Sequence, residues 1–244
     1  MRRLYSGYRL EEYQKMRQAS EAWYTPKFNF DLASPASYDK RRAVLKPILS
    51  EHLKRREIAR ILDYGGDRGD LVAGLIEGAQ AFVFDISGIP AAEGVISVKD
   101  PAACRADLII NSNVLEHVGF PRRTVMDTLA AAPESGLVFF EVPCELPFGL
   151  YRIARRIAQV GVMAITRPAV GLQVANPASL HMMHEHVNYF TEKTLTTLVR
   201  RAGAKVVASG TYRFSSRSGQ ADVAWCMAAR AGSDYHQGGD DAVD

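Results

Sequence analysis

The chain has 244 residues, of which 47% are apolar and 23% charged, and its net charge is +3. These values are typical of a soluble globular protein, and the mild basic excess does not favour nucleic-acid binding, which usually needs a concentrated basic stripe. The three cysteines form no CxxC pair, which argues against a zinc module and a disulfide framework and favours a reducing cytoplasm. Neither a signal peptide nor a membrane span is predicted.

The first part of the chain, residues 1–57, predicts helices and loops. A first helix fits LEEYQKMRQASEAWY and ends near Pro26. A second helix fits SPASYDKRRAVLKPILSEHLK, with Ser34 or Ser37 as the candidate N-cap.

From residue 58 the pattern changes to short runs rich in Val, Ile and Phe. Seven such runs are ARILDYG, AFVFDIS, GVISVKD, ADLIINSN, GLVFFEVP, AKVVASG and DVAWCMAA. Most are continuous apolar runs, as expected of strands that are buried on both faces. Helical stretches between them are DLVAGLIEG, PRRTVMDTLAAA and TEKTLTTLVRRAG. This alternation predicts an α/β domain with a mostly parallel sheet, whose strand carboxyl ends form the ligand-binding edge.

The connections suggest how the domain is organised. The link GIPAAEG between the second and third runs is too short for a full helix. The link between the fifth and sixth runs, about residues 143–190, is long, and such links usually form a lid or bind substrate. We therefore expect a domain over 58–232 with an insert at about 143–190, and a flexible acidic tail at 233–244.

The stretch ILDYGGDRGD combines glycines with carboxylates just after the first strand. Its glycines are Gly65, Gly66 and Gly69. Glycine allows positive φ and lets a ligand approach the backbone. The carboxylates of Asp63 and Asp67 would repel the pyrophosphate of a dinucleotide. S-adenosylmethionine carries an ammonium and a sulfonium and no phosphate, so the loop favours this cofactor, with Asp63 organising the loop and binding the ammonium.

A second carboxylate, Asp85, ends the second strand. A carboxylate there can accept hydrogen bonds from both ribose hydroxyls of an adenosine cofactor. Because NAD offers the same hydroxyls, Asp85 does not distinguish the two cofactors. The alternative is a nicotinamide-dependent oxidoreductase, but the acidic loop argues against it.

Five motifs together resemble the class I S-adenosylmethionine-dependent methyltransferases. They are ILDYGGDRGDL, FVFDIS, ADLIINSNVLEHV, LVFFEVP and HEHVNYFTEKTLTTLVRRAGAKVV, within about residues 40–230. The chain looks most like the branch that acts on sugars, polysaccharide intermediates and natural products. The resemblance implies a Rossmann-like three-layer sandwich with a seven-stranded, mostly parallel sheet and an antiparallel last strand. It implies S-adenosyl-L-methionine as the cofactor and, by analogy, an N-terminal segment over 1–57 that covers the site.

The resemblance also implies roles for the glycine loop. Asp63, Gly65 and Gly69 match the loop that holds the methionine part of the cofactor. Asp67 stands where glycine is commoner in the family, and we expect Gly66 to supply the backbone freedom instead.

Further positions follow from the resemblance. Asp85 matches the acid that binds ribose, Ile86 is expected to pack on the adenine, and Asp100 matches a position that reaches the adenine amino group. Three residues after the fourth strand are expected beside the methyl group: Asn111, Ser112 and Asn113.

The run HMMHEH carries His181, His184 and His186. Imidazole suits zinc or iron. However, His181 and His184 match one helical face, whereas His184 and His186 match one strand face, so no regular element presents all three. We predict no metal site here, and loop histidines bonded to the backbone stay open as an alternative.

We favour a general base within this run, because methyl transfer to oxygen requires the acceptor hydroxyl to lose its proton. The resemblance places the run above the sheet edge, with His184 as first choice and His186 as second. Glu141, at the end of the fifth strand, is a candidate to orient an imidazole or bind substrate hydroxyls. Glu116 and His117 in LEHV are expected to be structural.

The insert has no acidic residue between Glu145 and Glu185. Its arginines fit an anionic acceptor such as a nucleotide-linked or lipid-linked sugar, or an anionic membrane surface. A homodimer interface or a solvated face fits equally well.

The sequence as a whole predicts a cytoplasmic methyltransferase that converts S-adenosylmethionine to S-adenosylhomocysteine. The expected acceptor is a hydroxyl of a small molecule, either a sugar, a polysaccharide intermediate or a natural product. N- or C-methylation on the same scaffold, and cofactor binding without catalysis, stay open.

Overall fold

The computed structural model describes residues 34–53, 56–144, 186–216 and 219–232. It also describes the single residues Glu11, Lys15, Ile157, Ala158, Gly161 and Ile165. Within these ranges no helix combines the length and the hydropathy that crossing a bilayer requires. The first expected helix and most of the insert lie outside the described residues.

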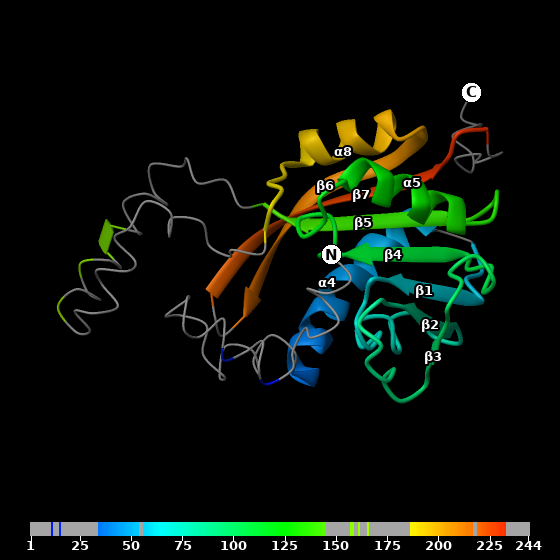
Figure 1. The fold of residues 1–244 in the computed structure, drawn as a ribbon, viewed down its shortest axis with the longest axis horizontal. Helices are drawn as coiled ribbons and strands as arrows, with labels where there is room; N and C mark the ends of the chain where they lie inside the picture. The colour runs from blue at the N-terminus through cyan, green and yellow to red at the C-terminus, as the bar shows by residue number, and fades with distance from the viewer. Residues whose placement is uncertain are drawn as a thin grey trace, which may run out of the picture.

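A single seven-stranded sheet forms the centre of the fold (Figure 1). Its strands are β1 (Arg60–Tyr64), β2 (Gln80–Phe84), β3 (Val95–Ser97), β4 (Leu108–Ser112), β5 (Leu137–Pro143), β6 (Ala204–Ser216) and β7 (Gly219–Arg230). Their order is β3-β2-β1-β4-β5-β7-β6, and β7 runs antiparallel to both of its neighbours. All seven expected strands are confirmed, as is the mostly parallel α/β sheet with its antiparallel last strand.

Helices cover both faces of the sheet (Figure 1). The helix α4 (Pro35–Leu53) packs on one face, while α5 (Pro121–Ala131) and α8 (Glu192–Arg201) pack on the other. Ser34 is the N-cap of α4, because its Oγ accepts the Ser37 N–H at 3.3 Å. The three-layer arrangement that the resemblance implied is therefore present.

The expected helix over DLVAGLIEG is wrong. Residues 70–78 form a series of turns, in which Gly74 and Gly78 have φ values of +68° and +75°. A residue in the left-handed region ends an α-helical run, so the apolar spacing alone could not make a helix. Leu71 and Leu75 are nevertheless buried on the same face of the sheet as α4.

Side chains alternate between the two faces along each strand. Towards α4, Ile61, Leu108 and Phe139 pack with Leu45 and Leu49 of that helix. This pattern continues to the carboxyl ends of the strands, where polar residues replace the apolar ones. The face that packs on α4 therefore also carries the polar groups of the candidate site.

The docking of α4 can be tested through Leu45, which is 0% exposed. Leu45→Ala should lower the free energy of unfolding by about 2–5 kcal/mol, because it removes buried methyl groups and leaves a cavity. Urea denaturation would measure the change. Lys46→Ala at the next, exposed position is the control and should stay within about 0.5 kcal/mol of wild type. Equal stability of both variants would contradict this docking.

Candidate functional site

The loop after β1 folds back over a buried carboxyl group. Asp63 is 2% exposed, and a Cβ added to Gly66 would lie 1.9 Å from its Cγ. Only glycine fits this close approach. The Oδ1 atom of Asp63 has no hydrogen-bond partner among the described residues. The loop therefore presents a buried acceptor at the carboxyl end of β1.

Burial raises the pKa of Asp63 to about 7. The nearby Arg41 guanidinium lowers this pKa, whereas the Glu141 carboxylate raises it. A carboxyl group with this pKa is only partly ionised near neutral pH, and a cation that binds beside it favours the fully ionised form. This property suits a ligand that carries an ammonium.

The conformation of the loop explains the unusual Asp67. Gly65, Asp67 and Gly69 have φ values of 80°, 59° and 77°. Gly66 is not among the positive-φ residues, so our expectation that it supplies the backbone freedom is wrong. Asp67 supplies it itself, because Asp enters the left-handed region more readily than most non-glycine residues. In this conformation the Asp67 N–H donates to Asp85 Oδ2 at 2.9 Å.

Two contacts place the loop beside Val114, which follows β4, and Val95, which begins β3. A Cβ added to Gly65 would lie 2.8 Å from Val114 Cγ2, and one added to Gly69 would lie 2.7 Å from Val95 Cγ1. The glycines are thus required both by backbone conformation and by space.

The other acids expected at the cofactor lie along the same edge of the sheet. Asp85 is half-buried after β2, and its second carboxylate oxygen accepts the Ser87 N–H at 2.7 Å. The adjacent Ile86 side chain is 47% exposed. Asp100, after β3, is exposed and accepts the Ala102 N–H at 3.0 Å.

The three residues expected beside the methyl group separate onto different surfaces. Asn111 is fully buried on the α5 face, where its Nδ2 donates to Thr128 Oγ1 at 3.2 Å. Ser112 lies on the α4 face, and Asn113 is exposed with φ +53°. Successive residues of a strand point to opposite faces, so one shared role for all three does not follow from their adjacency.

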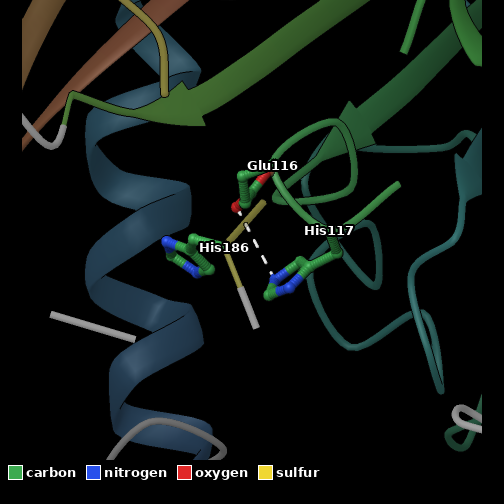
Figure 2. Close-up of side chains that lie close together, drawn as sticks. All are labelled: Glu116, His117 and His186. Atoms are coloured by element: carbon green, nitrogen blue, oxygen red, sulfur yellow. Dashed lines mark ion pairs between the residues drawn. The ribbon is translucent and has the colours of Figure 1, made fainter. Parts of the chain in front are cut away.

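A histidine from the end of the insert meets the turn after β4 (Figure 2). His186 is 7% exposed, and its ring lies edge-on to that of His117, with centroids 4.6 Å apart. His117 Nε2 lies 3.9 Å from Glu116 Oε1. The residues Glu116 and His117, expected to be structural, thus form a cluster with a candidate base. His181 and His184 lie outside the described residues.

Backbone hydrogen bonds hold His186 against this turn. The N–H groups of Val187 and Asn188 donate to the Glu116 carbonyl at 2.8 and 3.1 Å. The Asn188 Nδ2 donates to the carbonyls of Leu115 and Val118 at 2.9 and 2.6 Å. The segment after the insert is therefore fixed to the carboxyl end of β4.

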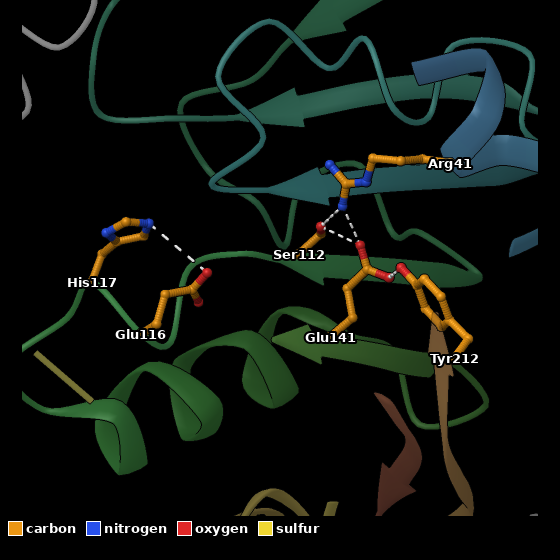
Figure 3. Close-up of polar contacts among 6 residues, drawn as sticks. All are labelled: Arg41, Ser112, Glu116, His117, Glu141 and Tyr212. Atoms are coloured by element: carbon orange, nitrogen blue, oxygen red, sulfur yellow. Dashed lines mark hydrogen bonds and ion pairs between the residues drawn. The ribbon is translucent and has the colours of Figure 1, made fainter. Parts of the chain in front are cut away.

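Glu141 is the centre of a second, buried network (Figure 3). Its carboxylate is 0% exposed and forms an ion pair with Arg41 of α4. Ser112 Oγ donates to Oε1 at 2.5 Å, and Tyr212 Oη of β6 donates to Oε2 at 2.8 Å. Arg41 also donates to Ser112. The network joins one helix to three strands.

The charges of this network reinforce one another. Burial opposes the charge on Arg41, but the Glu141 carboxylate favours that charge, and the pKa of Arg41 is raised further above its ordinary value. Burial and the Glu141 carboxylate raise the pKa of Tyr212. Arg41 is therefore a cation and Tyr212 a neutral hydrogen-bond donor at any ordinary pH.

Sequence reasoning found Glu141 and Ser112 and missed Arg41 and Tyr212. A signal for Arg41 was available, because the spacing of Arg41, Leu45 and Leu49 places it on the buried stripe of α4. Tyr212 lies beyond the expected sixth strand, which ended at Gly210, and no signal in the sequence marked it.

The ion pair yields a stability prediction. Arg41→Met should lower the free energy of unfolding by about 3–5 kcal/mol, because it leaves the buried Glu141 carboxylate without its cation. Adding Glu141→Gln to Arg41→Met should restore part of this loss. Chemical denaturation would measure both, with Lys40→Met, at an exposed position, as the control. A double variant no more stable than Arg41→Met would contradict the pairing.

Comparison with known proteins identifies the family of the chain. A family model described as a methyltransferase domain matches residues 37–209. No curated protein matches the chain.

Solved structures share the fold at low identity. One is the 1,6-didemethyltoxoflavin-N1-methyltransferase of Burkholderia thailandensis, bound to 1,6-didemethyltoxoflavin and S-adenosylhomocysteine. It is 17% identical, with a TM-score of 0.53 over 89% of this chain and 87% of that one. Another is the magnesium protoporphyrin IX methyltransferase of Synechocystis PCC 6803 with bound S-adenosylhomocysteine. It is 11% identical, with a TM-score of 0.52 over 93% of this chain and 98% of that one.

The family match covers more than half of the chain, and the described part of the chain folds into the seven-stranded sheet given above. The chain therefore belongs to the methyltransferase-domain family, and it is an S-adenosylmethionine-dependent methyltransferase.

Proposed function

We propose that this methyltransferase transfers the methyl group to a hydroxyl of a small-molecule acceptor, either a sugar, a polysaccharide intermediate or a natural product. One observation carries the proposal. Residues 186–190 dock on the turn after β4, and His186, the last residue of the histidine run, therefore lies at the carboxyl edge of the sheet. A histidine near that edge suits an acceptor that must lose a proton.

The residues at the loop fit the cofactor. The Oδ1 atom of the buried Asp63, which has no hydrogen-bond partner among the described residues, is the acceptor proposed for the ammonium of the cofactor. Gly65, Gly66 and Gly69 allow the methionine part to approach the backbone. Asp85 is proposed to bind the ribose hydroxyls, with Ile86 against the adenine and Asp100 near its amino group. When bound, S-adenosylmethionine supplies an electrophilic methyl group, and the protein supplies proximity and orientation.

His184 is the residue that we propose as general base. The buried position of His186 against Glu116 and His117 makes it the less suitable of the two candidates. Glu141 is engaged by Arg41, Ser112 and Tyr212, which supports a role in holding the acceptor side of the site together rather than in proton transfer.

The surroundings of the site extend this proposal. The basic composition of the insert supports an anionic or lipid-linked acceptor, and it also suits an anionic membrane surface or a homodimer. We place the enzyme in the cytoplasm, with the N-terminal segment covering the site. The solved relatives include an N1-methyltransferase, so nitrogen acceptors belong in the same acceptor panel.

Cofactor binding should release a proton below neutral pH. The pKa of Asp63 is raised to about 7 in the free protein, so this group is mostly protonated at pH values near 6. A bound ammonium favours the ionised form, so affinity should rise as the pH approaches about 8 and proton release should vanish there. Isothermal titration calorimetry in buffers of different ionisation enthalpy would measure the release.

A matched pair of variants assigns this proton. Asp63→Asn should abolish the buffer dependence near pH 6, whereas Asp70→Asn, a half-buried neighbour in the same stretch, should keep it. Unchanged proton release in Asp63→Asn would remove Asp63 from the ammonium site.

The base proposal predicts a selective kinetic loss. His184→Ala should reduce turnover by about 10²–10⁴-fold and leave the dissociation constant of S-adenosylmethionine nearly unchanged, because a base acts only on the acceptor. Transfer of a labelled methyl group to a panel of sugar and natural-product hydroxyls, with nitrogen acceptors included, would measure the rate. His181→Ala in the same run is the control. An unaffected rate would exclude His184, and binding without transfer to any acceptor would favour the non-catalytic alternative.

A further inference from the structure

We propose that Glu116, His117 and His186 form a binding site for a divalent transition-metal cation, with Zn²⁺ as the best-suited ion. One ligand atom of each of the three side chains lies within 4.8 Å of the others. This group differs from the run of three histidines weighed in the sequence. Two of its members come from the LEHV turn, and only His186 comes from the run.

The chemistry of the three side chains suits this ion. Two imidazoles and one carboxylate make up the protein ligands of several zinc enzymes, which leave a fourth position for water or substrate. The Glu116 and His186 side chains are nearly fully buried, and that of His117 is only 14% exposed. The low exposure of these side chains limits the access of water to an ion held between them.

The present geometry requires only a small closure. In a tetrahedral site with bonds of about 2.0–2.2 Å, neighbouring ligand atoms lie roughly 3.4 Å apart. His117 Nε2 and Glu116 Oε1 are already 3.9 Å apart. The two rings meet edge to face at 80° rather than stacked, so their nitrogens can approach one point from different directions (Figure 2).

The backbone fixes the third ligand before any ion binds. His186 is followed by two N–H groups that donate to the Glu116 carbonyl, and by an Asn188 amide that bridges the carbonyls of Leu115 and Val118. These bonds tie the segment carrying His186 to the turn that carries the other two ligands. Support of this kind around a metal site lowers the entropy lost on binding and fixes the ligand directions.

The location gives the ion access to the reaction site. Val114 packs against Gly65 of the cofactor loop, and Glu116 follows two residues later. The metal site therefore lies on the turn after β4, which contacts the cofactor loop through Val114. Its open coordination position is available to an oxygen of the acceptor, although metal binding itself does not rest on the proposed hydroxyl methylation.

Metal content tests the proposal directly. The full chain without an affinity tag, exposed to Zn²⁺ and dialysed, should hold about one ion per chain by elemental analysis, and Co²⁺ in its place should give visible absorption bands of a low-coordinate site. His186→Gln and Glu116→Gln should each weaken Zn²⁺ binding at least about 100-fold in competition with a chromogenic chelator.

Two further variants separate a built site from incidental binding by histidine. His52→Gln removes a histidine on α4 that packs against Trp225, and it should leave Zn²⁺ affinity unchanged. Asn188→Ala keeps all three ligands but removes the side-chain amide that donates to the Leu115 and Val118 carbonyls. It should weaken Zn²⁺ affinity by about 10-fold. It also serves if a ligand variant does not fold. The proposal would be overturned if the wild-type protein bound neither Zn²⁺ nor Co²⁺. It would also be overturned if wild-type protein bound Zn²⁺ no more tightly than the Asn188→Ala and His186→Gln variants do.

The outcome is independent of methyl transfer. Metal uptake without turnover would support this site and contradict the proposed function. Turnover by protein that takes up no metal would contradict the metal site and support the proposed function.

Discussion

The buried ion pair between Arg41 and Glu141 is the interaction on which the arrangement of the site depends. A carboxylate with no exposure to water requires a partner, and here the cation comes from a helix outside the sheet. The same carboxylate accepts hydrogen bonds from β4 and β6. The pair also acts at a distance, since Arg41 and Glu141 shift the pKa of Asp63 in opposite directions. The electrostatics of the cofactor loop and the packing of α4 are thus linked.

The sheet could be predicted from the sequence because its strands are short apolar runs rich in Val, Ile and Phe. The run LVFFEVP is short, follows Gly136 and ends at Pro143, which favours a strand buried on both faces over a buried helix. The turns at residues 70–78 show the limit of that reasoning. Leu71 and Leu75 are buried as helix periodicity requires, but Gly74 sets a backbone conformation that the periodicity does not report. Burial was predictable there, and local conformation was not.

The same division holds for the site. Acids that end parallel strands must gather at one edge, so Asp63 and Asp85 could be placed from their positions in the chain. The Asp67 turn, the pairing of Arg41 with Glu141 and the meeting of His117 with His186 depend on contacts between distant segments. Tertiary proximity of this kind leaves no trace in a short window of sequence. Only Arg41 had a partial signal, through its place on the buried stripe of α4.

The origin of Arg41 has a consequence for where the autonomously folding unit begins. A boundary at residue 57 or 58, drawn where the sequence changes from helix to strand, would separate Arg41 of α4 from the Glu141 carboxylate that it neutralises in the sheet. The remaining Rossmann-like part would then contain the buried Glu141 carboxylate without its cation. The apolar face of its sheet that packs on α4 would also be uncovered. The family match begins at Ser37, within the first turn of α4, which agrees with a minimal unit that starts at the Ser34 cap. The helix is therefore an integral layer of the catalytic domain, not an appendage to it.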